Sequence, residues 1–195
     1  MKTQLHDAIG ALKATSGVSA DEGERLAELA SQVPDHGVIV EIGSCQGRSA
    51  AYMAAALRPK SKVLIYCVDL WMLGVGRTPD RHHSPGGYLR FKGNLFSLRL
   101  FKHIVPIMCE STKLAKVWTQ EIDLLFIDGG HQYEEVKADY ESWGKFVKPG
   151  GVIAFHDYTT WPSIKKIVDK KLNLKKDWEF LSLDNRIWSA RKRGG

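Results

Sequence analysis

The sequence predicts an α/β fold built on a doubly wound, mostly parallel sheet. Almost wholly apolar runs of five or six residues occur at 38–42, 122–127 and 151–155, with Gly or Pro close by. Apolar runs of this length are typical of central strands that are covered on both faces. Segments of helical periodicity separate these runs, and a helix between two strands makes a right-handed crossover that keeps the strands parallel. Such sheets bind ligands at the carboxyl ends of their strands.

The clearest crossover unit spans residues 122–157. Its first strand ends at Asp128 and its second at His156-Asp157, while His131 falls in the turn that follows the first strand. The intervening helix is indicated by apolar residues at every third or fourth position and by a Pro-Gly-Gly stop: Tyr133, Val136, Tyr140, Trp143, Val147 and Pro149-Gly150-Gly151. Because the two strands are parallel, these polar side chains are expected at one edge of the sheet. The sequence therefore predicts a site there.

The other elements follow from similar patterns. Residues 1–36 are expected to form a helical extension, in which Ser19 and Glu22 have the spacing of a capping box. An Ala-rich helix is predicted at about 48–57, and further strands are predicted at 63–68, 104–108, 178–183 and 186–190. Pro106 requires its strand to lie at or near a sheet edge. The turn pair Asp184-Asn185 predicts a final hairpin, so the last strand should be antiparallel and the whole a Rossmann-like sheet.

Length and composition limit the class of protein. With 195 residues and no composition break, the chain is expected to form one domain, 1–195. It has no run that could span a bilayer and no signal region, which predicts a cytoplasmic protein with no membrane partner. The net charge of +6 is explained by a solvated Lys-rich helix face, so nucleic acid is not the expected partner. Cys45, Cys67 and Cys109 are expected to be reduced thiols without chemistry.

Residues 71–87 form the one long irregular segment and are expected to be a lid-like insertion. The segment and its boundary carry aromatic and basic side chains: Trp71, Arg77, Arg81, His82, His83 and Tyr88. These side chains either grip an anionic or sugar-like acceptor or are solvated loop residues, and the spacing selects neither. Trp161-Pro162 either borders the acceptor pocket or opens the next helix.

A glycine-containing turn follows the first strand. In Glu41-Ile42-Gly43-Ser44-Cys45-Gln46-Gly47, backbone amides and a helix start lie where a ligand can approach closely. The turn lacks the second glycine of a Gly-x-Gly-x-x-Gly motif, which argues against a pyrophosphate. Asp69, at the end of the next strand, is placed to accept hydrogen bonds from ribose hydroxyls, and Glu41 suits an ammonium group. A ligand with an adenosine half and a cationic amino-acid half fits these features.

With these motifs in this order, the chain resembles class I S-adenosylmethionine-dependent methyltransferases. The closest resemblance is to the compact, metal-assisted O-methyltransferase branch, in which strand-Asp-Gly-x-His-x-Tyr is followed by strand-His-Asp. The resemblance runs from about Val38 to Tyr158 and implies a seven-stranded sheet whose last strand is reversed. It also implies S-adenosylmethionine as the cofactor and a small hydroxylated molecule as the acceptor. A homo-oligomer is left open.

Residue by residue, the resemblance implies a cofactor site. Gly43 and Ser44 would line the methionine half of the cofactor, with Ser49 at its carboxylate. Asp69 would hold the ribose, and Glu110 and Ser111 would flank the adenine; Ser49 and Ser111 are alternatively ordinary helix-start hydroxyls. The candidate cofactor-binding set is Glu41, Gly43, Ser44, Gly47, Ser49, Asp69, Glu110, Ser111 and Asp128.

Asp128 and Asp157 offer hard oxygen ligands for one divalent cation, Mg²⁺ or, as second choice, Mn²⁺. His131 is the candidate base that removes the hydroxyl proton, and Asp128 is grouped with it as catalytic. In the catechol branch of the family, a Lys stands at the place of His131 and an Asn at that of Tyr158. This departure favours an alcohol or sugar hydroxyl and leaves the third metal ligand unnamed. His156 is a candidate for that ligand, although a core histidine beneath the site is the favoured interpretation. Alternatively, Asp128 only caps the helix near Gln132.

Rival functions remain. The positive charge suggests a nucleic-acid methyltransferase, but Asp128-Gly129-Gly130-His131 differs from the Asn/Asp-Pro-Pro-Tyr/Phe motif of amino-methylating branches. A cofactor-binding relative without transfer activity, similar to cephalosporin hydroxylases, is the alternative from another class.

Overall fold

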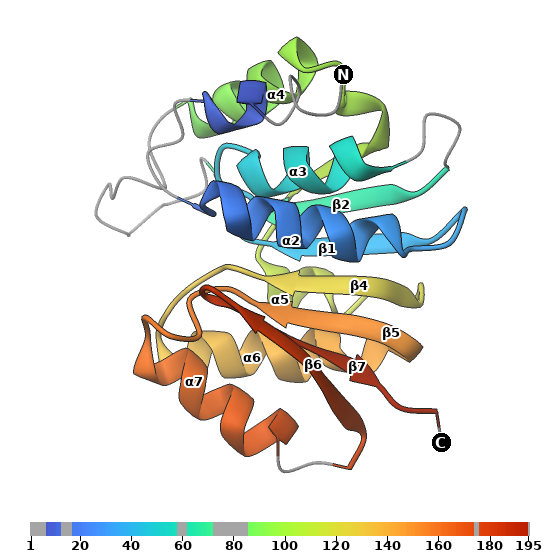
Figure 1. The fold of residues 1–195 in the computed structure, drawn as a ribbon, viewed down its shortest axis with the longest axis vertical. Coiled ribbons are helices and arrows are strands. Elements are labelled where there is room, and N and C mark those ends of the chain that lie inside the picture. The colour runs from blue at the N-terminus through green and yellow to red at the C-terminus, as the bar shows by residue number, and fades with distance from the viewer. Residues whose placement is uncertain (1–6, 13–16, 58–61, 72–85, 174–175, 195) are drawn as a thin grey trace.

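Seven strands form one sheet in the order β3-β2-β1-β4-β5-β7-β6 (Figure 1). The computed structural model describes residues 7–12, 17–57, 62–71, 86–173 and 176–194. The strands are β1 (Val38–Ile42), β2 (Leu64–Asp69), β3 (Ile104–Met108), β4 (Ile122–Ile127), β5 (Val147–Phe155), β6 (Trp178–Asp184) and β7 (Ile187–Lys192). Only β7 runs antiparallel to its neighbours, β5 and β6. The predicted seven-stranded, doubly wound sheet with a reversed last strand is confirmed.

Besides the helical turn at 7–10, the described residues form six helices and three short turns. The helices are α2 (Ala20–Ser31), α3 (Arg48–Ala56), α4 (Gly87–Ser97), α5 (Ser111–Leu114), α6 (Tyr133–Trp143) and α7 (Pro162–Val168). The turns are the 3₁₀ segments η1 (Phe101–His103) and η2 (Gly144–Phe146) and the π segment η3 (Asp169–Asn173). Among the described residues, none of the helices is long and apolar enough to cross a membrane.

The sheet separates two apolar cores. Successive residues of a strand point to opposite faces, so Leu124 and Phe126 of β4 join one core while Leu125 and Ile127 join the other. The first core packs under α2, α3 and α4, and the second under α5, α6 and α7. Every residue of β4 is buried, as expected for a strand covered on both faces.

The chain reverses its direction of winding between β1 and β4. From β1 it proceeds outward to β2 and β3, and then it returns to add β4 and β5 on the other side. The turns that leave these two central strands touch, since the Asp128 N–H donates to the Ile42 carbonyl at 2.8 Å. Ligands of open α/β sheets bind at such a reversal, so the site belongs at the carboxyl ends of β1 and β4.

Most predicted bounds agree with the structure to within a residue or two, with one correction. Strand β5 begins at Val147 rather than at residue 151, because Gly150 adopts a φ of 79° and a register shift lets Val147 pair with Ile122. Within the described residues, the region 1–36 contains a helical turn at 7–10 and α2, and its prediction as a helical extension stays a prediction. Pro106 does lie in an edge strand, β3.

Candidate active site

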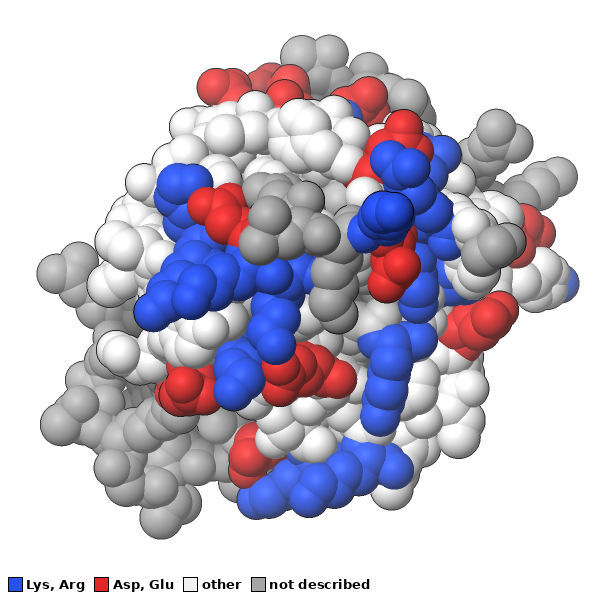
Figure 2. All heavy atoms as spheres, turned by 90° about the horizontal axis from the view of Figure 1, so that it is seen from below, with Lys and Arg blue, Asp and Glu red and all other residues white. Residues whose placement is uncertain are grey.

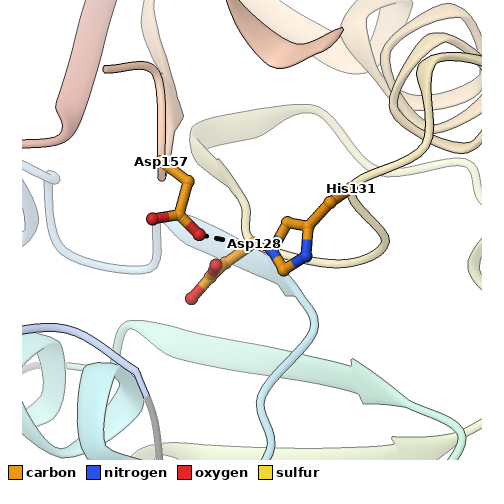
Figure 3. A group of neighbouring side chains, drawn as sticks. All are labelled: Asp128, His131 and Asp157. Atoms are coloured by element: carbon orange, nitrogen blue, oxygen red, sulfur yellow. Dashed lines mark ion pairs between the residues drawn. The ribbon is translucent and has the colours of Figure 1, made fainter. Parts of the chain in front are cut away.

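Two carboxylates and an imidazole converge beyond the ends of β4 and β5 (Figure 3). Asp128, His131 and Asp157 each offer one ligand atom, and these atoms all lie within 4.8 Å of one another. Asp128 and Asp157 directly follow parallel neighbouring strands, which is why their side chains reach the same space. The sequence prediction that these groups meet agrees with this geometry.

Asp157 lies in a strained and crowded position. Its φ is 58°, a left-handed backbone conformation, and only 7% of the residue is exposed. Its Oδ1 accepts a hydrogen bond from Arg186 Nη1 at 2.9 Å, and its Oδ2 lies 3.3 Å from His131 Nε2. Burial would raise the pKa of this carboxyl, but His131, His156 and Arg186 hold it well below its ordinary range. Asp157 is therefore an anion held between positive groups.

His156 is a buried histidine that bridges carboxylates, as the core-histidine alternative expected. Its Nδ1 lies 2.9 Å from Asp128 Oδ1, and its Nε2 lies 3.2 Å from Glu22 Oε2. Burial would lower the pKa of His156, but Asp128, Asp157 and Glu22 raise it to about 11. Both ring nitrogens of His156 are therefore engaged by carboxylates in this structure.

Asp128 does not cap the following helix. The residue that precedes α6 is Gln132, whose N–H donates to Glu135 Oε2 at 3.3 Å. The capping alternative for Asp128 is therefore wrong, because the helix begins five residues further along the chain, at Tyr133, and Gln132 serves as its cap.

Two charged residues that sequence reasoning did not assign to the site complete its surroundings. Glu22, in the first turn of α2, is fully buried and accepts hydrogen bonds from Arg186 Nε and Nη2, both at 2.7 Å. Arg186 lies in the turn between β6 and β7 and also donates to Asp157. The predicted antiparallel last strand could have indicated Arg186, because it places the hairpin turn at the carboxyl edge of the sheet.

The glycine turn packs tightly against the Asp128 turn. Gly43 has a φ of 88°, and a Cβ there would lie 2.2 Å from the Asp128 carbonyl oxygen. Gly47 has a φ of 81°, and a Cβ there would lie 2.9 Å from Phe91. Both glycines are thus required by backbone conformation and by packing. Their predicted contact with a ligand stays a prediction.

Glu41 is the most unusual side chain of the turn. It is 0% exposed, and neither of its carboxylate oxygens has a hydrogen-bond partner among the described residues. The Ser44 hydroxyl is also buried without a partner there. Burial raises the pKa of Glu41 to about 7, although the nearby hydroxyls of Ser44 and Ser49 oppose this rise without reaching hydrogen-bond geometry. An unpaired buried carboxylate is costly, and a cationic ligand group would relieve that cost.

Asp69 organises the turn itself. Its Oδ2 accepts from the Cys45 N–H at 2.8 Å, and its Oδ1 accepts from the Trp71 N–H at 2.7 Å. Each oxygen keeps a second lone pair, so the predicted ribose contact remains open. Trp71 is fully buried and its indole N–H donates to the Cys45 carbonyl at 2.6 Å. Trp71 therefore braces the turn, a role that differs from both alternatives left open for it, a grip on the acceptor and a solvated loop residue.

The predicted adenine residues have different surroundings. Glu110 is exposed and pairs with Lys113 at 2.8 Å, which lowers the pKa of Glu110. The Ser111 hydroxyl donates a short hydrogen bond to Asp139, a buried residue of α6. Burial raises the pKa of Asp139 to about 6. Ser49 is buried near the start of α3.

Of the other predicted lid residues, Tyr88 packs on Trp71 with ring centroids 5.1 Å apart, whereas Arg77, Arg81, His82 and His83 lie outside the described residues.

Comparison with known proteins places the chain in a family. The model of a family described as "Methyltransferase domain" matches residues 40–158. The chain belongs to this methyltransferase family. A curated relative, an uncharacterized protein of Sinorhizobium fredii, is 30% identical over 128 residues, which is 61% of this chain but 13% of that protein. The chain thus spans about an eighth of that relative's length.

Solved structures of methyltransferases share the fold. The O-methyltransferase NovP superposes with a TM-score of 0.76 at 16% identity and with full coverage of both chains. The O-methyltransferase TomG from Streptomyces achromogenes, solved in complex with SAM, gives a TM-score of 0.68 at 16% identity, covering 99% of this chain and 88% of that one. The recognition of a methyltransferase domain is confirmed by the family match, and the fold is shared with solved methyltransferases.

The basic surface of this methyltransferase is interspersed with acids. On the face shown in Figure 2, Lys and Arg side chains lie in bands with Asp and Glu between them. Near α7, Lys165 pairs with Asp169 at 2.7 Å, and Lys171 pairs with Glu141 at 2.9 Å. Local pairing of this kind is typical of a solvated helix face. That face does not by itself argue for nucleic acid.

Proposed function

We propose that this methyltransferase transfers a methyl group from S-adenosylmethionine to a hydroxyl of a small molecule, of sugar or natural-product type, with help from a divalent metal ion. The observation that carries the proposal is the convergence of Asp128, His131 and Asp157 directly beside the glycine turn that follows β1. A hydroxyl needs a base and charge stabilisation close to the methyl donor, and this edge of the sheet offers both.

Residues of the glycine turn fit the cofactor. The unpaired, buried Glu41 carboxylate suits the ammonium group of the methionine half. Asp69, with a free lone pair on each oxygen, suits the ribose hydroxyls. The cofactor-bound structure of TomG has the same fold, which supports a cofactor at the corresponding place.

The carboxylates also fit a hard divalent cation such as Mg²⁺ or Mn²⁺. Donor atoms within 4.8 Å of one another are compatible with shared ligation by Asp128 and Asp157. When bound, the ion would lower the pKa of the acceptor hydroxyl and help to hold its oxygen. Arg186 and His156 each neutralise part of the negative charge on these carboxylates, so the site suits an ion that keeps several waters.

His131 is the candidate base. Its Nε2 lies 3.3 Å from Asp157, and that hydrogen bond raises the pKa of His131 against the opposing effect of burial. Its ring stacks on Trp161 with centroids 4.8 Å apart and an interplanar angle of 5°. Trp161 is 42% exposed and offers an apolar face beside the base, which favours an acceptor with a ring. Nε2 either takes up the proton or binds the metal, and the proposal assigns it the proton.

The test is production of S-adenosylhomocysteine from a panel of hydroxylated small molecules, with and without chelator. Turnover on at least one acceptor, lost in chelator and restored by Mg²⁺ or Mn²⁺, is expected. His131→Ala should lower turnover roughly 100-fold or more, with partial recovery at high pH, where the hydroxyl ionises unaided. His36→Ala, at an exposed histidine, is the matched control. Cofactor binding without turnover on every acceptor would favour the non-transferase alternative, and methylation of RNA or DNA alone would favour the nucleic-acid one.

A further inference from the structure

Glu22 caps a helix, but it is more deeply buried and has more hydrogen-bond partners than a capping residue needs. As part of the capping box of α2, its Oε2 accepts from the Ser19 N–H at 2.7 Å, and its own N–H donates to Ser19 Oγ at 3.3 Å. Helix caps serve this purpose at the protein surface, where water satisfies the rest of the carboxylate. Glu22, however, is 0% exposed. A buried carboxylate must find its remaining partners within the protein.

Those partners are the two cations that touch the site carboxylates. Arg186 donates to Glu22 from Nε and Nη2, both at 2.7 Å, which is a bidentate pair. His156 meets Glu22 through Nε2 at 3.2 Å. Each of these side chains also contacts a site carboxylate. Arg186 Nη1 lies 2.9 Å from Asp157 Oδ1, and His156 Nδ1 lies 2.9 Å from Asp128 Oδ1.

We propose that Glu22 is a positioning residue of the active site, which holds Asp128 and Asp157 in place through His156 and Arg186. The proposal rests on the proposed function for what the two carboxylates do. Glu22 itself contacts neither Asp128 nor Asp157 directly. Its effect is transmitted by the side chains of Arg186 and His156, each of which contacts Glu22 and a site carboxylate.

The shared contacts show why Glu22 matters. Glu22 holds Arg186 and His156 on one side while Asp157 and Asp128 hold them on the other, so loss of the Glu22 charge would weaken the hold on Arg186 Nε and Nη2 and on His156 Nε2. Arg186 could then turn from Glu22 to take both oxygens of Asp157. A carboxylate so engaged no longer offers an oxygen to a divalent ion. Partners of ligating carboxylates typically change metal affinity by about 10- to 100-fold when they are mutated.

The topology makes this arrangement possible. Helix α2 precedes β1, so its first turn lies at the carboxyl edge of the sheet, and the antiparallel β7 starts at the same edge. The Arg186 carbonyl also accepts from the Tyr158 N–H at 3.0 Å, which fixes the hairpin turn beside Asp157. The helix start and the hairpin turn thus meet over the ends of β4 and β5.

The decisive variant is Glu22→Gln, because Gln keeps the capping interaction but loses the charge. Ser19→Ala is the matched control, since it removes the capping hydroxyl and leaves Glu22 ionised. Mn²⁺ affinity of the purified protein is measured by electron paramagnetic resonance. Glu22→Gln should weaken Mn²⁺ binding about tenfold or more, whereas Ser19→Ala should stay within about twofold. Equal loss in both variants, or no loss in Glu22→Gln, would overturn the proposal.

A second measurement does not depend on the metal. The ring ¹⁵N signals of His131, which contacts Asp157 rather than Glu22, should shift in Glu22→Gln but not in Ser19→Ala. Unchanged His131 signals in Glu22→Gln would show that nothing is transmitted from Glu22 to the site. If the wild-type protein binds no Mn²⁺, the metal assignment of the proposed function fails, and the His131 signals alone then decide the role of Glu22.

Discussion

Glu41 stands out among single residues because its carboxylate is buried without a partner among the described residues. The sequence predicted an acidic residue at the ligand end of β1, since the apolar run ends beside it. Its degree of burial could not be predicted, because burial depends on α3 and on the turn closing over it. The raised pKa of Glu41 therefore results from burial in the folded protein and could not be predicted from the sequence motif.

A pH dependence of cofactor affinity follows from Glu41. Its pKa is raised to about 7, so it is largely protonated at pH 6 and ionised at pH 8. An ammonium group binds the ionised form, and affinity for S-adenosylhomocysteine should rise with pH across this range, by up to roughly tenfold. Calorimetry at pH 6, 7 and 8 checks this. The rise should disappear in Glu41→Gln and for methylthioadenosine, which lacks the amino-acid half; a flat profile with the wild-type protein would exclude the ammonium contact.

At the scale of elements, the glycine turn after β1 is fixed by its contact with the turn after β4. Gly43→Ala would place a Cβ 2.2 Å from the Asp128 carbonyl oxygen at a φ of 88°. The substitution should lower the free energy of unfolding by about 2 kcal/mol, because the strain of a left-handed alanine adds to the clash. Urea unfolding measures the change.

Gly93→Ala is the matched control for this prediction. Gly93 lies inside α4, and a Cβ there would meet nothing within 4 Å. Alanine should therefore stabilise the protein by about 0.5–1 kcal/mol. If both variants had the same effect, the contact between the two turns would not be what requires Gly43.

Elements were predictable where the sequence pattern is local. The apolar runs fixed β1 and β4 to the residue, and Ser19 with Glu22 marked the start of α2. The start of β5 was not predictable, since its first residues pair with β4 only through the irregularity at Gly150. Long-range pairing decides such boundaries, and a local pattern does not contain it.

At the scale of the molecule, the charged cluster should influence stability in acid. Burial would raise the pKa of Glu22, but His156, Arg186 and Ser19 lower it from 4.5 to about 2. Its stabilising contribution is complete above about pH 5 and is lost as the pH falls toward 2, because the unfolded chain takes up the proton first. Urea unfolding at pH 6 and pH 3.5 measures the loss.

The wild-type protein and Glu22→Gln should differ in how steeply the free energy of unfolding falls with pH. Between these two pH values, the wild-type protein should lose about 1 kcal/mol more stability than Glu22→Gln does. Glu121→Gln, at an exposed position, should behave like the wild-type protein. Parallel losses in wild type and Glu22→Gln would contradict the lowered pKa.

The candidate site was predictable only in part, because some of its residues meet through the packing of distant elements. Asp128, His131 and Asp157 follow strand ends, so a sheet prediction brings them together. Glu22 and Arg186 come from a helix start and a hairpin turn, and their meeting depends on how α2 and β7 pack on the sheet. A prediction of individual elements does not determine that packing.

Glu22 and Arg186 are separated by 164 residues, and their pairing has a consequence for protein synthesis. A nascent chain still attached to the ribosome can complete the glycine turn once β4 and Asp128 have emerged, but Glu22 lacks Arg186 until the final hairpin has followed. The growing polypeptide would therefore assemble the contact between the two central turns before it completes the charged cluster.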